Sequence, residues 1–175
     1  MTETIQNSVI SVLIEDESGA LARVVGLFSG RGYNIESLTV ALVDAEQKLS
    51  RITVLTSGTP MVIQQIKAQL KRLIPVHDVC DLTEEGPYVG RELALVKIVS
   101  SGEHRTEALR IADSFRARPV DTTATSFVFE LTGSPEKIDA FIELMRPLGL
   151  AEVSRTGIAA IGRGPSVFHL NKEPV

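Results

Sequence analysis

The sequence predicts two small α+β units in tandem, each with strands and helices in the order β-α-β-β-α-β. Three observations support this: the same order of apolar patterns occurs twice in 175 residues, a polar Gly-Pro stretch at 83–87 separates the copies, and only 5% of residues are aromatic. This order is the ferredoxin-like arrangement, an antiparallel four-stranded sheet with two helices on one face. We expect the first unit at 1–84 and the second at 85–175, with a frayed tail from about residue 162.

The first unit opens with a β-branched apolar run at 8–14, which predicts a buried strand. A helix follows, because apolar residues recur on one helical face at Leu21, Val24, Val25 and Phe28. The sequence Gly30-Arg31-Gly32 ends this helix, since glycine can adopt the left-handed conformation of a C-cap. A second helix begins at Thr59-Pro60, an N-cap followed by proline at the first helical position. The remaining strands are expected at 33–43, 49–57 and 76–82.

The second unit repeats this pattern after the polar stretch. Two helices are predicted from apolar stripes, the second of which opens with Ser134-Pro135 in the same way as the helix at Thr59-Pro60. The strands are expected at 93–99, 118–123, 125–131 and 150–155. Units this small bury only about 60% of their unfolded surface and leave open sheet edges, so both should pair with another copy.

Charge and composition exclude several classes of function. The net charge is −4, and residues 1–86 carry all of the acidic excess, with seven basic and eleven acidic side chains. Neither half has the basic surface that nucleic-acid binding requires, so we expect no nucleic-acid partner. No apolar run approaches the ~20 residues of a membrane helix, and we expect no membrane association. The single cysteine fits a reducing, cytoplasmic compartment.

The sequence offers no constellation that predicts catalysis or metal binding. The three histidines, His77, His104 and His169, are scattered between a strand, a loop and the tail. His77 and Cys80 are three residues apart in a strand, so their side chains should point to opposite faces. We therefore predict no catalytic residue, no metal site and no cofactor in this chain, although an enzyme in its own right remains an alternative hypothesis.

The strongest local feature is the turn between the first strand and the first helix, at 15–21. Free backbone N–H groups of Gly19, Ala20 and Leu21 at a helix N-terminus attract anions such as a carboxylate, and glycine lets a ligand approach the backbone. Asp16 could accept a hydrogen bond from an ammonium group, so the turn would suit an α-amino acid. The alternative is an ordinary helix capped by Ser18, with acidic residues favouring the helix dipole.

This turn lies within a stretch, 12–38, that resembles the opening of the small, regulatory subunit of acetolactate synthase (acetohydroxyacid synthase). The most specific part is Arg-Gly-Tyr-Asn-Ile-Glu-Ser-Leu at 31–38. Shorter similarities occur at 49–53, 91–98 and 155–157, and the resemblance covers about residues 8–164. The chain departs from the family at Asp16, where many members have asparagine, and at Ala22, where a small polar residue is common.

The resemblance implies that the first unit is an ACT domain, a ferredoxin-like module that binds amino acids. The chain would activate a separate catalytic subunit that carries thiamine diphosphate, magnesium and FAD, and would make it sensitive to feedback inhibition by valine in branched-chain amino-acid synthesis. Two ACT domains would pair as a homodimer with the effector between them. One copy would supply Asp16, Gly19, Ala20 and Leu21, and the other Asn34 and Ile35.

Two alternatives remain open from the sequence. Asn34 can be a turn-favouring residue before a strand rather than a ligand, although its amide can both donate and accept hydrogen bonds. The whole chain can instead be a stand-alone tandem-ACT amino-acid sensor that regulates another protein.

Overall fold

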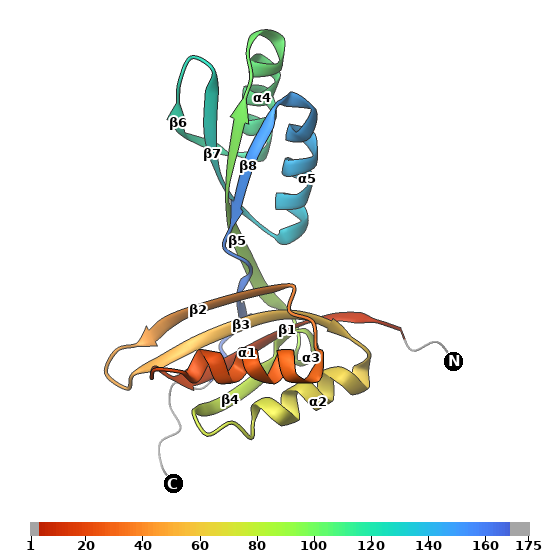
Figure 1. Ribbon diagram of the computed structural model, residues 1–175, viewed down its shortest axis with the longest axis vertical. Coiled ribbons are helices and arrows are strands. Elements are labelled where there is room, and N and C mark those ends of the chain that lie inside the picture. Colours follow the sequence, from red (N-terminus) through yellow and green to blue (C-terminus); the bar gives the residue numbers. More distant parts are fainter. Residues whose placement is uncertain (1–3, 169–175) are drawn as a thin grey trace. The chain divides into compact units, whose positions relative to one another are not determined.

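Each half of the chain forms an antiparallel sheet with helices on one face in the computed structural model, which describes residues 4–168 (Figure 1). Contacts divide these residues into a first unit, 4–89 together with 158–168, and a second unit, 90–157. This division differs from the predicted one, because residues 158–168 belong to the first unit rather than to the second. No helix within 4–168 is both long and apolar enough to cross a membrane.

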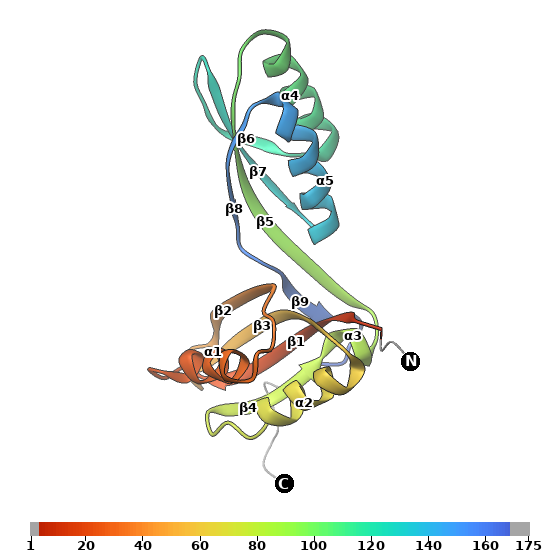
Figure 2. The ribbon, with the colours of Figure 1, turned by 45° about the vertical axis from the view of Figure 1, so that its right-hand side comes forward.

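The first unit has the predicted element order, with sheet order β2-β3-β1-β4. Helix α1 lies under the β2 side of the sheet and helix α2 under the β4 side (Figure 2). The bounds of these elements are β1 Gln6–Glu15, α1 Ala20–Arg31, β2 Ser37–Asp44, β3 Leu49–Gly58, α2 Pro60–Leu70 and β4 Val76–Asp81.

The core of this unit lies between the sheet and its two helices. Alternate residues of β1 and β3 face the helices in register, as in the pairs Ile10–Val54 and Val12–Ile52. The predicted caps are confirmed at α2, where the Thr59 side chain accepts a hydrogen bond from the backbone of Val62. The core side chains that the helices contribute are Ala20, Val24, Phe28, Ile63, Ile66 and Leu70.

The opposite face of this sheet is covered by the end of the described chain. A short strand, β9 (Ala159–Gly162), was not predicted and lies across this face (Figure 2). Ile158, Ala160 and Phe168 pack against Val9 and Cys80 of the sheet and against Leu82, which follows β4. Of the tail expected from about residue 162, only Phe168 joins this apolar cluster, and residues 163–167 are irregular and exposed.

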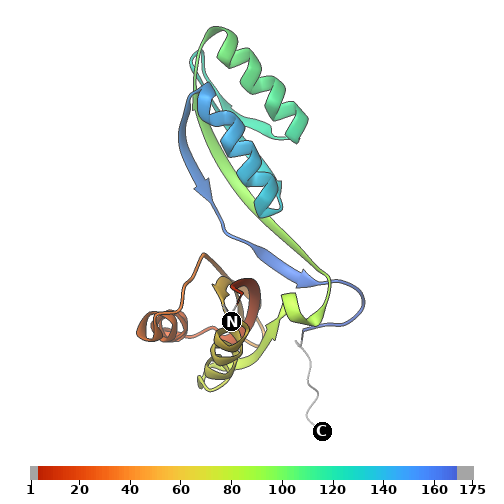
Figure 3. The same ribbon diagram turned by 90° about the vertical axis from the view of Figure 1, so that its right-hand side faces the viewer.

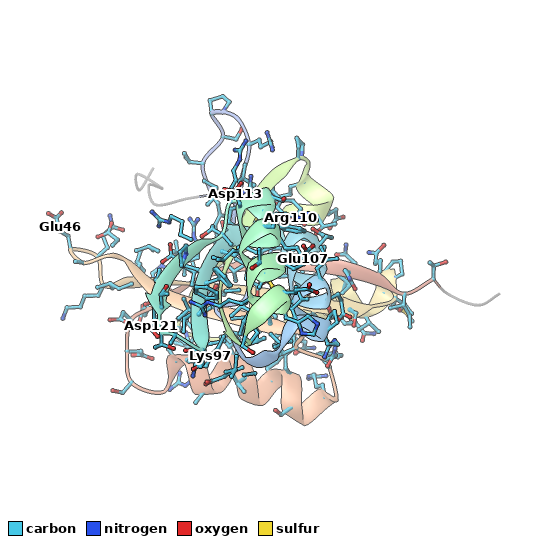
Figure 4. The ribbon with its side chains drawn as sticks, turned by 90° about the horizontal axis from the view of Figure 1, so that it is seen from above. Glu46, Lys97, Glu107, Arg110, Asp113 and Asp121 are labelled. Atoms are coloured by element: carbon cyan, nitrogen blue, oxygen red, sulfur yellow. The ribbon has the colours of Figure 1, made fainter. Side chains whose placement is uncertain are left out.

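The second unit repeats the topology, with sheet order β6-β7-β5-β8. Helices α4 and α5 cover the same face of this sheet (Figure 3). Along the outer side of α4, Glu107, Arg110 and Asp113 follow at intervals of three (Figure 4), and Arg110 forms an ion pair with Glu107 at 3.2 Å. The elements are β5 Tyr88–Val99, α4 Gly102–Phe115, β6 Arg118–Thr122, β7 Ser126–Gly133, α5 Pro135–Met145, the 3-10 turn η1 Arg146–Leu148 and β8 Leu150–Arg155.

A charged cluster ties β5 to β8 at one end of this sheet. Glu92 is only 5% exposed, and Arg155 donates to both of its carboxylate oxygens, at 2.7 and 2.8 Å. Arg155 also donates to Asp139 at 2.6 Å, and this pairing raises the pKa of the guanidinium. The segments 91–98 and 155–157, singled out from the sequence, are thus joined here in the fold.

Three predicted boundaries differ from the structure. The strand expected at 33–43 begins only at Ser37, because 33–36 form the approach from α1. The stretch 83–87 is not a plain linker, since a short helix, α3 (Leu82–Glu85), occupies most of it with Asp81 as N-cap. Strand β5 begins at Tyr88 rather than at residue 93.

Candidate functional site

The turn between β1 and α1 has the geometry of an uncapped helix N-terminus. Gly19 is the N-cap, with φ of 86° and ψ of −7°, a left-handed conformation that glycine adopts without strain. No side chain within 4–168 caps the helix. The alternative of a helix capped by Ser18 is therefore wrong.

The backbone donors of this turn are only partly free. The N–H groups of Gly19 and Leu21 have no acceptor among residues 4–168. The N–H of Ala20, in contrast, donates to the carbonyl of Glu17 at 3.2 Å, so the expectation that it is free is wrong. The Ala20 side chain is buried in the core, whereas Leu21 is 38% exposed. Two unpaired donors thus remain at a positive helix end that favours an anion.

Asp16 is held beside this turn by two contacts from β3 and the hairpin before it. Its carboxylate Oδ1 accepts a hydrogen bond from the Ser50 hydroxyl at 2.9 Å, and its backbone N–H donates to the carbonyl of Lys48 at 2.7 Å. Ser50 is only 5% exposed, while Asp16 is exposed to solvent. The second carboxylate oxygen accepts no hydrogen bond from residues 4–168 and can receive a cationic group. The sequence did not indicate this contact from Ser50.

Asn34 and Ile35 lie at the other end of α1, in the loop that leads into β2. The carbonyl of Asn34 accepts a hydrogen bond from the Thr56 hydroxyl at 2.6 Å, which fixes the backbone, and its side chain is exposed and unpaired among the described residues. Gly32 ends α1 in the left-handed conformation, as expected. The next turn hydrogen bond runs from the N–H of Tyr33 to the carbonyl of Phe28 at 3.0 Å.

One copy of the chain does not bring these two groups of residues together. Helix α1 separates Gly19 from Gly32 by twelve residues. At a rise of about 1.5 Å per residue, the two ends of the helix lie about 18 Å apart. A ligand the size of an amino acid cannot contact Asp16 and Asn34 of the same chain, so a site that uses both needs a second copy.

Strand β2 provides a surface for such a second copy. It forms one edge of the first sheet, and its outer half exposes Val40, Leu42 and Val43 to between 43% and 52%. Helix α1, on the same side of the sheet, exposes Leu21 and Val25 to 38% and 37%, although the sequence pattern placed both on the buried face (Figure 2). An apolar sheet edge of this kind is a template for pairing with another strand.

The other residues considered from the sequence lie outside this turn. His77 is half exposed, with Nε2 at 3.4 Å from the carboxylate of Glu15, and His104 is exposed in the first turn of α4. Cys80 is a buried free thiol, and burial together with a hydrogen bond to Glu85 raises its pKa to about 12. Such a thiol stays protonated near neutral pH and is a poor nucleophile. His169 lies outside the described residues.

Comparison with known proteins decides the family. Residues 10–78 match a family described as the AHAS small subunit-like ACT domain, and residues 91–164 match one described as the small subunit of acetolactate synthase. The chain is 46% identical over 161 residues to the acetolactate synthase isozyme 3 small subunit of Salmonella typhimurium, covering 91% of this chain and 98% of that protein. The chain belongs to the acetolactate synthase small-subunit family.

Further members of the small-subunit family agree with this assignment. A probable acetolactate synthase small subunit of Archaeoglobus fulgidus is 44% identical over 155 residues, which are 89% of this chain and 96% of that protein. The crystal structure of the acetolactate synthase small subunit from Thermotoga maritima superposes with a TM-score of 0.82 at 32% identity, covering 92% of this chain and 99% of that one. The tandem ferredoxin-like fold, with an ACT domain first, is thereby confirmed.

Proposed function

We propose that the chain is the regulatory subunit of acetolactate synthase, which activates a separate catalytic subunit and makes it sensitive to inhibition by valine. The observation that supports this most strongly is family membership over nearly the whole chain. In this proposal the chain itself performs no chemistry. Thiamine diphosphate, magnesium and FAD belong to the catalytic subunit. The complex works in the cytoplasm, where a free thiol such as Cys80 is kept reduced.

The effector site is proposed at the interface of two first units paired along β2. The unpaired N–H groups of Gly19 and Leu21 bind the valine carboxylate, and the free oxygen of Asp16 accepts a hydrogen bond from its ammonium group. Ala20 lines the floor of the turn. Asn34 and Ile35 of the second copy complete the site, because they lie about 18 Å away in the first.

Regulation in this proposal is allosteric in the strict sense. Valine changes the activity only if it binds the inhibited complex more tightly than the active one. Valine bound between two copies of the chain would prefer the inhibited complex if the two first units pair differently in the active and the inhibited complex. Neither nucleic acid nor membrane takes part.

Reconstitution with a purified acetolactate synthase catalytic subunit tests the proposal. We expect the chain to raise the rate of acetolactate formation from pyruvate, and valine to lower it again. The variant Gly19→Asp should keep the activation and lose valine sensitivity, because a carboxylate about 4–5 Å from that of valine raises the inhibitory concentration roughly tenfold or more. Inhibition unchanged in this variant would contradict the site.

A matched control exists in the second unit. Gly102 also begins a helix at positive φ, 59°, with open space around it, so Gly102→Asp adds the same charge and a similar backbone strain. This variant should remain sensitive to valine. If the chain binds valine but leaves the catalytic subunit unaffected, it is instead a stand-alone amino-acid sensor.

A further inference from the structure

A cavity of about 430 Å³ lies on the face of the first sheet away from α1 and α2, beside the segment 158–168 that covers this face. Its floor includes Ser11 of β1 and Arg51 of β3. Their neighbours Ile10, Val12 and Ile52 face the helices, so these two side chains point to the other face. Its wall is formed by the segment that follows Ile158, including Ala160, Val167 and Phe168.

Two polar atoms at this cavity are buried without a partner. The Ser11 hydroxyl and the Nε of Arg51 make no hydrogen bond with residues 4–168, and Ser11 is only 1% exposed. Buried donors are nearly always paired in native proteins, because an unpaired one has lost its water without replacement. Residues 4–168 supply no partner to either atom, so an acceptor bound in the cavity would satisfy both.

The charge at this cavity is also uncompensated. The guanidinium of Arg51 is permanently cationic, and it forms no ion pair with any described carboxylate. None of the described residues that line the cavity is acidic. An anion at this position would both accept a hydrogen bond from Nε of Arg51 and compensate its charge.

The other residues that line the cavity favour a ligand with an apolar group. Apart from Ser166, the side chains of these residues are apolar, and they come from Leu82, Ala160, Ile161, Val167 and Phe168, of which Ile161 and Val167 are also exposed to solvent. The ring centre of Phe168 lies 5.5 Å from Cζ of Arg51. This distance allows a cation–π interaction that holds the guanidinium against the ring. Small-molecule sites typically combine an apolar lining of this size with a few fixed polar groups.

We propose that this cavity binds a small monocarboxylate with a compact apolar group. The carboxylate accepts hydrogen bonds from Nε of Arg51 and from the hydroxyl of Ser11, and the apolar group packs between Val167 and Phe168. The site shares no residue with the proposed valine site, which lies at the turn between β1 and α1 and at the β2 edge. The proposal is therefore independent of the proposed function.

Titration of the full chain with benzoate, followed by amide NMR, tests this site. We expect saturable shifts at the amides of Ser11, Ala160 and Gly164, with a dissociation constant in the millimolar range or tighter. Benzamide, which has the same ring and no charge, and inorganic phosphate, which has the charge and no ring, should each bind at least tenfold more weakly. Equal binding of either probe, or no saturable shift with benzoate, would overturn the proposal.

Two variants place the binding at Arg51. Arg51→Met should abolish the benzoate shifts, whereas Arg110→Met, on the exposed side of α4 (Figure 4), should leave them unchanged. Phe168→Ala leaves the strands intact and should weaken benzoate binding severalfold, which keeps the test decisive if Arg51→Met folds poorly. Benzoate binding that survives both Arg51→Met and Phe168→Ala would contradict the assignment.

Discussion

Replacement of Arg155 by methionine should destabilise the second unit more than replacement of any other single charged side chain in that unit. The guanidinium makes two hydrogen bonds to Glu92, which is 5% exposed, and a third to Asp139. Methionine keeps much of the apolar stem but leaves the Glu92 carboxylate buried and unpaired. Removal of one partner of a buried ion pair costs about 3–5 kcal/mol. The 68 residues of this unit have a total stability of roughly 3–10 kcal/mol, so Arg155→Met should come close to unfolding it.

Urea denaturation followed by far-ultraviolet circular dichroism measures this loss. The matched control is Lys97→Met, which removes an ion pair with Glu152 between the same two strands. That pair is exposed, so its loss should cost no more than about 1 kcal/mol. Adding Glu92→Gln to Arg155→Met should restore much of the stability, because it removes the unpaired charge. If Arg155→Met costs no more than Lys97→Met, the cluster does not stabilise β5 against β8.

Two further predictions concern stability. The folded pKa of the Cys80 thiol, about 12, lies above that of an unfolded thiol, so its contribution to the free energy of unfolding is intact below pH ~8.5 and falls as pH rises from there toward 12. The melting temperature should therefore drop over this window less steeply in Cys80→Ala than in the unaltered chain. Ultraviolet absorbance that shows the native thiol ionising below pH 10 would contradict this prediction. Gly149→Ala should cost roughly 3 kcal/mol or more, since a Cβ there lies 2.1 Å from the carbonyl oxygen of Val99 at a φ of 100°. Gly164→Ala, at a φ of 84° with open space, should cost about 1 kcal/mol, and equal losses in the two variants would refute the steric argument.

Local signals predicted the elements of both units. Thr59-Pro60 and Ser134-Pro135 each open a helix with the side chain of the first residue as N-cap, because capping depends only on neighbouring residues. The repeated order of strands and helices then gave the correct topology twice. The covering strand β9 was missed, since four residues carry too little pattern and their place depends on packing against a distant sheet face.

The candidate site was predicted only in part. The sequence left the turn at Gly19 open between free backbone donors and a helix capped by Ser18. The role of Ser50 emerges only from the pairing of β1 with β3, which places its hydroxyl beside Asp16. Periodicity assigned Leu21 and Val25 to the core, and both are partly exposed. A helical pattern shows that a face is apolar, but it does not show whether the cover is the same chain or a second copy.

Valine binding by mixed dimers tests the central claim, that each effector site takes one half from each of two copies. Gly19→Asp damages one half and Asn34→Ala the other, so neither variant alone should bind valine. When equal amounts are mixed and allowed to re-pair, half of the dimers contain one chain of each kind, and one of their two sites is intact. Calorimetry should then show about one quarter of the binding capacity of the unaltered chain, with unchanged affinity. A mixture that binds no valine would contradict the shared site.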